Sequence, residues 1–116
     1  MNASGALFGG VILAWVDEAA AIAARKLFHS TNFSTVAING GIQFKRPVFL
    51  GDLVLLRSTL VRVGTTSLTF HVDVEVFDSA DPTPVCIVDE IVFVLKNAQG
   101  RPLPHGLSPS FIPSRP

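Results

Sequence analysis

The sequence has a single cysteine, Cys86, which excludes an internal disulfide and a set of cysteines that would bind zinc. Its three histidines, at positions 29, 71 and 105, lack the spacing of metal ligands, so we expect no metal site. Neither charge is in excess, because nine basic residues balance nine acidic ones. This balance gives no indication of a nucleic-acid partner or of an anionic membrane surface. The cysteine usage makes the cytoplasm the expected compartment.

No stretch of the sequence has the properties of a membrane span. The most apolar one, residues 11–27, is too short to cross a bilayer and contains the charged residues Asp17, Glu18, Arg25 and Lys26. The first residues lack the basic region of a secretory signal peptide. We therefore expect a helix buried in protein and no insertion into a membrane.

What the sequence does contain is enough apolar material for one small domain, because 48% of its 116 residues are hydrophobic. Residues 9–28 are rich in alanine, the best helix former, and predict a long helix. This helix is apolar on almost every side, which predicts burial on most sides. A sheet that curves around the helix, or a second copy that extends the sheet, would provide that burial.

Four strand-like segments follow the helix. They cover residues 34–48, 53–63, 67–77 and 85–96, and the third alternates clearly between apolar and polar positions. Gly40-Gly41 interrupts the first segment and predicts a bulge or a close backbone approach. One helix followed by antiparallel strands indicates a single α+β domain over residues 1–100. The remaining residues, 101–116, include five prolines and predict an extended or disordered tail.

The most informative segment combines two glycines with an acidic residue inside an apolar helix. Gly9-Gly10 can form the helix N-terminus, where free N–H groups and the positive end of the dipole suit a developing oxyanion. Asp17 follows after close to two turns and therefore lies under nearly the same face as Gly10. A carboxylate there is suited to act as a general base or a nucleophile toward a carbonyl. The alternatives are that Asp17 pairs with an arginine at an interface and that the glycines only allow tight packing.

The same segment resembles the hotdog-fold acyl-CoA thioesterases, including the bacterial YciA type and the cytosolic mammalian acyl-CoA hydrolases. The resemblance begins with Asn2-x-x-Gly5-x-x-Phe8-Gly9-Gly10 and Trp15-Val16-Asp17-Glu18-Ala19-Ala20. It continues through Phe44-Lys45-Arg46-Pro47-Val48, Gly51-Asp52 and Arg62-Val63-Gly64-Thr65-Thr66-Ser67. The match covers residues 2–96, and the order and spacing of the motifs are more specific than any one of them.

The resemblance implies a long central helix wrapped by an antiparallel sheet that continues across a homodimer, often within a hexamer. It implies hydrolysis of acyl-CoA to a free acid and coenzyme A, at sites on the dimer interface and without a metal or bound cofactor. Asp17 would be the catalytic carboxylate, the backbone N–H of Gly10 would bind the thioester oxygen, and Asn2 of the opposite chain would complete the site. The residues expected along the substrate are Phe8, Gly9, Lys45, Gly64 and Ser67, with the acyl chain near Trp15 and Phe44.

The sequence also departs from this family and leaves other functions open. Family members usually have a strand before the asparagine, whereas this sequence starts one residue before Asn2. We therefore expect that the sheet lacks that strand or that the sequence is truncated. An alternative function is a non-catalytic acyl-CoA-binding domain that senses its ligand and acts through a partner. A hydratase or dehydratase ranks last, because no histidine falls in the motif at the helix start.

Overall fold

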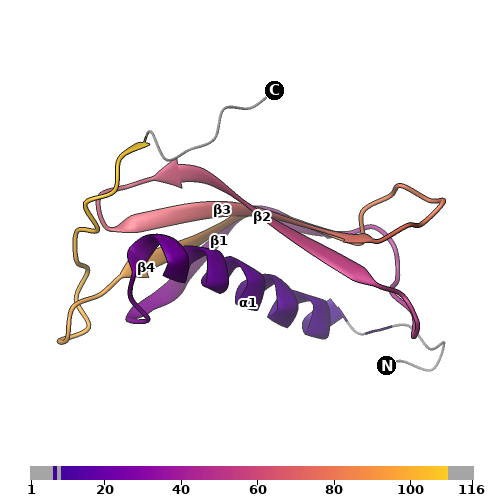
Figure 1. The fold of residues 1–116 in the computed structure, drawn as a ribbon, viewed down its shortest axis with the longest axis horizontal. Helices are drawn as coiled ribbons and strands as arrows, with labels where there is room; N and C mark the ends of the chain where they lie inside the picture. Colours follow the sequence, from indigo (N-terminus) through magenta and orange to yellow (C-terminus); the bar gives the residue numbers. More distant parts are fainter. Residues whose placement is uncertain (1–6, 8, 110–116) are drawn as a thin grey trace.

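A long helix packs on one face of a four-stranded antiparallel sheet in this computed structural model, which describes residue 7 and residues 9–109 (Figure 1). The elements follow in the order α1 (Gly9–Phe28), β1 (Phe33–Phe44), β2 (Val54–Val63), β3 (Ser67–Val76) and β4 (Cys86–Leu95). Neighbours in the sheet are ordered β1-β4-β3-β2, so β3 and β4 are central and β1 and β2 form the edges. The predicted α+β class is confirmed, with element bounds that differ from the predicted ones by a few residues.

One side of α1 makes the contact with the sheet. Its buried residues recur every four positions and pack against β2, β3 and β4; they are Ile12, Val16, Ala20, Ala24 and Phe28. The other sides of the helix are not covered, because the sheet lies on one side only. The exposed fractions of Val11 and Ile22 are 38% and 53%. Burial of the helix on most sides, as the sequence predicts, therefore does not occur within a single chain.

The apolar positions of β3 line the core, as their alternation predicts. Leu68, Phe70, Val72 and Val74 are buried, and Val76 is partly buried at the end of the strand. Phe70 meets Phe93 of β4 edge to face, with ring centroids 6.0 Å apart. These contacts make the two central strands a firm support for α1.

The edge strand β1 is irregular where two glycines occur. Its pairing with β4 shifts between Asn39 and Ile42, and Gly40 and Gly41 have φ angles of 78° and 106°. Glycine adopts such positive angles readily, whereas other residues rarely do. The carboxylate of Asp89 also occupies the space where a Cβ on Gly40 would lie. The bulge predicted at Gly40-Gly41 is therefore confirmed.

β1 also exposes apolar side chains. Val36, Ile38, Ile42 and Phe44 have exposed fractions of 52%, 46%, 37% and 49%. One edge of β1 pairs with β4, and no other strand of the described chain pairs with its second edge. A long free edge with apolar side chains is suited to pair with another strand.

After β4 the chain turns back and packs against the domain. Lys96 forms a β-bridge with Pro102, and the amide of Leu103 donates a hydrogen bond of 2.8 Å to the carbonyl of Leu95. Further on, His105 lies against Phe28 at the end of α1, with ring centroids 5.8 Å apart. Among residues 7 and 9–109, no helix combines the length and the hydropathy that crossing a membrane requires.

Candidate functional site at the start of the helix

The two glycines at the start of α1 have different surroundings. A Cβ on Gly9 would lie 3.1 Å from the ring of Phe44, so Gly9 allows β1 to pack closely against the helix start. A Cβ on Gly10 would have no neighbour within 4 Å, and Gly10 is exposed. The first N–H groups of a helix have no acceptor within the helix, and no described residue accepts from Gly10. Tight packing thus accounts for Gly9, whereas Gly10 presents a donor to the surface.

Asp17 lies on the exposed side of α1 and is held by β1. Its Oδ1 accepts a hydrogen bond of 2.8 Å from the hydroxyl of Thr35. A carboxylate has about four lone-pair sites, so this single bond leaves capacity for a water molecule or a substrate atom. Glu18 points about 100° away around the helix, and within the described residues its carboxylate has no hydrogen bond or ion pair. Only Asp17 of this acidic pair is positioned by a neighbouring element.

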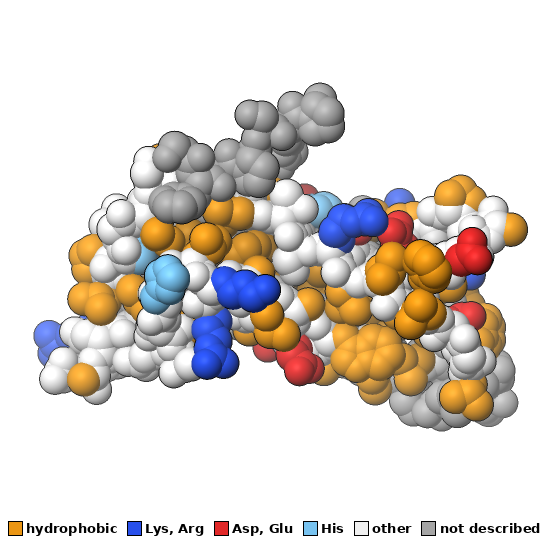
Figure 2. All heavy atoms as spheres, in the orientation of Figure 1, with side chains coloured by type: hydrophobic (Ala, Val, Ile, Leu, Met, Phe, Trp, Pro, Cys, Tyr) orange, Lys and Arg blue, Asp and Glu red, His pale blue; other side chains and the backbone are white. Residues whose placement is uncertain are grey.

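An open hollow of about 490 Å³ lies beside the helix start. It is lined by Leu7, Gly9, Ile12, Phe44, Lys45, Arg46 and Pro47. The ammonium group of Lys45 forms no ion pair with any described residue, so it is free to meet an anionic group. Figure 2 shows apolar side chains gathered over this end of the molecule, where α1 begins. Gly9 and Lys45, both predicted as site residues, therefore line one surface.

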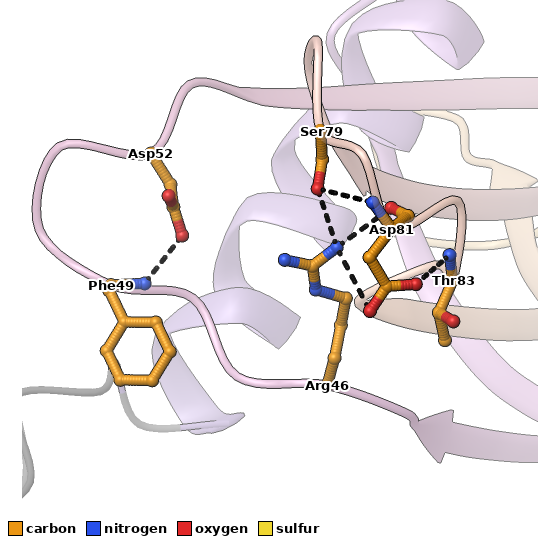
Figure 3. A network of polar contacts seen from close by, with 6 residues as sticks. All are labelled: Arg46, Phe49, Asp52, Ser79, Asp81 and Thr83. Carbon is orange, nitrogen blue, oxygen red and sulfur yellow. Dashed lines mark hydrogen bonds and ion pairs between the residues drawn. The ribbon is translucent and has the colours of Figure 1, made fainter.

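Arg46 makes a structural contact that fixes this surface (Figure 3). Its Nη1 donates hydrogen bonds of 3.2 Å to the hydroxyl of Ser79 and 3.0 Å to the carbonyl of Asp81, and it lies 3.8 Å from the Asp81 carboxylate. Hydrogen bonds from the side chain and backbone of Thr83 lower the pKa of Asp81, which lies beside Arg46. The network ties the loop between β3 and β4 to the segment after β1, and so holds Lys45 beside the helix start.

Trp15 faces a second, smaller hollow of about 180 Å³ with Leu7, Val48, Phe49 and Leu50 among its lining residues. The turn at residues 49–52, which lines this hollow, is closed by a hydrogen bond of 2.9 Å from the amide of Phe49 to the carboxylate of Asp52 (Figure 3). This apolar lining is compatible with an acyl chain, which the family resemblance leads us to expect near Trp15.

Gly64 and Ser67 lie at the other end of the molecule, in the turn between β2 and β3. The amide of Gly64 donates 3.0 Å to the carbonyl of Ser67, and the Ser67 hydroxyl occupies the space where a Cβ on Gly64 would lie. His105 joins this turn to Phe28. Phe28 is about 27 Å from Gly10 along the helix axis. The predicted substrate residues therefore form two groups at opposite ends of α1.

Asn2 and Phe8, the remaining predicted site residues, lie outside the described residues, so their roles stay predictions. The contacts of two residues near the site were not predicted from the sequence. Thr35 is 18 positions from Asp17 and on another element, so no local spacing indicates their hydrogen bond. Arg46 stands beside the predicted Lys45, but its partners in the loop between β3 and β4 are known only from the fold.

The family model of the thioesterase superfamily matches residues 4–83, which include α1, β1, β2 and β3. The chain belongs to the thioesterase superfamily. The family model spans both the segment that holds Gly10 and Asp17 and the turn that holds Gly64 and Ser67. The resemblance of these motifs to hotdog-fold thioesterases is thereby confirmed at the level of the family.

Individual relatives of this thioesterase-superfamily chain agree with that assignment. It is 37% identical over 73 residues to the acyl-CoA thioester hydrolase YciA of Salmonella typhimurium, covering 63% of this chain and 53% of the relative. It is 32% identical over 111 residues to an uncharacterized acyl-CoA thioester hydrolase of Haemophilus influenzae, covering 90% of this chain and 70% of the relative. The chain thus spans only about half the length of the Salmonella protein.

A solved structure confirms the hotdog fold of this superfamily member. A hexameric hotdog fold thioesterase of Campylobacter jejuni matches it with a TM-score of 0.69 and 34% identity, covering 89% of this chain and 79% of that chain. The long helix on a single antiparallel sheet is therefore the architecture that the sequence predicted.

Proposed function

We propose that this chain hydrolyses acyl-CoA thioesters to a free acid and coenzyme A. The observation that carries the proposal is the exposed Asp17 carboxylate, held by Thr35 at 2.8 Å, on the same helix as the Gly10 N–H, from which no described residue accepts a hydrogen bond. Asp17 takes a proton from a water molecule whose oxygen attacks the thioester carbonyl carbon, or Asp17 attacks that carbon itself. In the second route the coenzyme A thiolate leaves, and water then hydrolyses the acyl anhydride on Asp17. In the water route the C–S bond then breaks, and the coenzyme A thiolate takes the proton back from Asp17. The Gly10 N–H stabilises the oxyanion.

We further propose that each site combines Asp17 of one chain with Gly10 of a second copy. The two residues are about 10 Å apart along one helix axis. Both the carboxylate of Asp17 and the oxyanion donor must lie about 3 Å from the reacting atoms of the substrate. Because Gly10 of the same chain is too far from Asp17 for this, a donor from a second chain is favoured. A twofold axis at the β1 edge reverses the direction of the second helix, and so can bring its Gly10 level with Asp17.

The free edge of β1 supports this dimer. Its exposed apolar residues, including Ile38 and Phe44, would be covered when two sheets join edge to edge. The exposed Ile22 on α1 is a further apolar surface that a second copy would cover. We propose a homodimer, with assembly of three dimers into a hexamer by analogy with the hexameric Campylobacter thioesterase.

The remaining predicted residues take supporting roles in this proposal. Asn2 of the second chain orients the water molecule or the thioester, and Phe8 and Gly9 border the substrate. Lys45 meets an anionic group of coenzyme A, and the turn at Gly64 and Ser67 lies along its arm. The reaction needs no metal or bound cofactor, and the proposed compartment is the cytoplasm.

The test is hydrolysis of a panel of acyl-CoA thioesters by the wild type and by Asp17→Asn. The substitution keeps the shape of the side chain but removes the base, so we expect kcat to fall by about 10²-fold or more. Glu18→Gln is the matched control, because Glu18 is exposed and has no partner within the described chain. It should retain activity.

The same panel separates catalysis from sensing. Tight binding of acyl-CoA by the wild type without any turnover, measured by calorimetry, would favour the non-catalytic acyl-CoA-binding domain. Turnover that Asp17→Asn leaves unchanged would remove Asp17 from the mechanism.

A further inference from the structure

Residues 96–107, which follow β4 and are called the strap below, hold the turn between β2 and β3. The amide of His105 donates a hydrogen bond of 3.1 Å to the carbonyl of Thr65, and its Nε2 lies 3.0 Å from the carbonyl of Ser67. The amide of Leu107 donates 2.9 Å to Nδ1 of the same ring. A carbonyl only accepts and an amide N–H only donates, so the ring carries its proton on Nε2. His105 therefore contacts the turn through both its backbone and its side chain.

The strap also joins the turn to the core. The His105 ring packs on Phe28 at the end of α1, with centroids 5.8 Å apart. In Figure 1 the strap follows β4 at the end of the molecule where α1 terminates. The turn is thus held between the helix end and the sheet rather than projecting freely as most hairpin turns do.

Three carbonyl groups at this turn accept hydrogen bonds from elsewhere in the protein. The carbonyl of Thr65 accepts from His105, that of Thr66 accepts 2.9 Å from the amide of Leu95, and that of Ser67 accepts from Gly64 and from the His105 ring. In a trans peptide, the N–H of the next residue points away from the carbonyl. The N–H of Thr66 therefore points away from the strap, and no described residue accepts from it.

We infer that His105 is a positioning residue for coenzyme A. Its backbone amide holds the Thr65 carbonyl and its ring holds the Ser67 carbonyl, which leaves the Thr66 amide and the exposed Thr65 hydroxyl as donors on the outer side. These donors suit acceptor oxygens of the coenzyme A arm, which are its amide carbonyls and phosphates. The inference deepens the proposed function and rests on it, because that function places the coenzyme A arm along this turn.

The experiment compares two substrates of the same acyl group. One is acyl-CoA, and the other is the acyl thioester of N-acetylcysteamine, which lacks the phosphates and most of the pantetheine arm. His105→Phe keeps the ring contact with Phe28 but removes both ring nitrogens. We expect KM for acyl-CoA to rise about tenfold with little change in kcat, because one partly buried hydrogen bond is lost on each side of the ring. Turnover of the truncated substrate should not change.

Two conservative variants identify which contact matters. His105→Gln retains a donor that reaches the Ser67 carbonyl and should restore KM for acyl-CoA. His105→Asn is too short for its NH2 group to reach the Ser67 carbonyl, although its oxygen can still accept from the Leu107 amide, so it should not restore KM. His71→Phe makes the same replacement on β3, where His71 contacts Asp89, and should leave both substrates unaffected.

Equal loss of activity toward both substrates, or an unchanged KM for acyl-CoA, would overturn the inference. Thermal unfolding of each variant shows whether a loss reflects folding, and the Gln and Asn pair keeps the test decisive if the Phe variant is unstable. If the wild type hydrolyses neither substrate, the proposed function fails by itself. The affinity for free coenzyme A, measured by calorimetry, then tests His105 separately, and we expect His105→Phe and His105→Asn to weaken it.

Discussion

Asp17 is exposed on the helix, yet its carboxylate has a defined orientation because Thr35 donates to it from the neighbouring strand. A catalytic carboxylate acts efficiently only when it is held close to its productive geometry. The contact therefore links the fold of β1 directly to the chemistry proposed at α1. It also explains why an exposed acid need not be a solvated surface charge.

Replacing Thr35 by valine tests this link, because valine has nearly the same shape but no hydroxyl. We expect kcat for acyl-CoA to fall about tenfold, with little change in KM, because a hydrogen bond to a charged group contributes about 1.5–3 kcal/mol. Steady-state kinetics provide the measurement. Thr35→Ser keeps the hydroxyl and should retain most of the activity. Equal rates for the valine variant and the wild type would show that the hydrogen bond is incidental.

The roles of the two adjacent glycines, Gly9 and Gly10, could be predicted from the sequence only in part. Their position marks the helix start, and both readings of the pair, packing and oxyanion binding, follow from the sequence. In the structure the two roles fall to different residues. Gly9 packs against the ring of Phe44, whereas Gly10 faces open space and is suited to oxyanion binding. That division depends on where β1 passes, which is a tertiary contact and not a local pattern.

Among the elements, β1 and α1 differ most from what the sequence indicates. Periodicity predicts where each element lies, and the diglycine predicts the bulge in β1. The helix is apolar on almost every side, but a sheet on one side covers only the strip from Ile12 to Phe28. The exposed apolar residues of β1 and α1 are therefore surface that no described part of this chain covers, and that a second chain is suited to bury.

A charged residue on the β1 edge tests whether a second chain pairs there, because charged edge residues oppose pairing between strands. We expect Ile38→Lys to convert the proposed dimer to a monomer in analytical ultracentrifugation and to abolish the proposed acyl-CoA hydrolysis. Leu55→Lys is the matched control on the other edge strand, where Leu55 has an exposed fraction of 39% against 46% for Ile38. A dimer that survives Ile38→Lys would place the interface elsewhere.

At the scale of the whole molecule, the predicted site residues form two groups separated along α1. The helix start carries Gly9, Gly10 and Lys45, whereas Gly64 and Ser67 lie near the helix end. A residue list from the sequence contains no information on this separation, because it depends on how the hairpin β2–β3 packs along the helix.

The long-range contacts that organise the molecule were also beyond sequence reasoning. The bonds from Arg46 to the loop between β3 and β4 and from His105 to the turn between β2 and β3 each join residues more than 30 positions apart. Periodicity and turn signals operate over much shorter distances. The family resemblance supplied the candidate residues, and the fold supplied the contacts that hold them.

The shared site can be tested with two variants that are each inactive alone. Asp17→Asn lacks the base. Gly10→Pro lacks the donor N–H, and proline is tolerated in the first turn of a helix. Gly10→Ala keeps the N–H and should remain active, because the added Cβ meets no neighbour within 4 Å.

Mixing the two inactive proteins after unfolding and refolding them together is the most direct test of the account. In a random mixture half of the dimers are mixed, and each mixed dimer has one site with both Asp17 and Gly10 intact, so we predict about one quarter of the wild-type activity. Each variant refolded alone should stay inactive. Mixed dimers that assemble but recover no acyl-CoA hydrolysis would contradict a site shared between two chains.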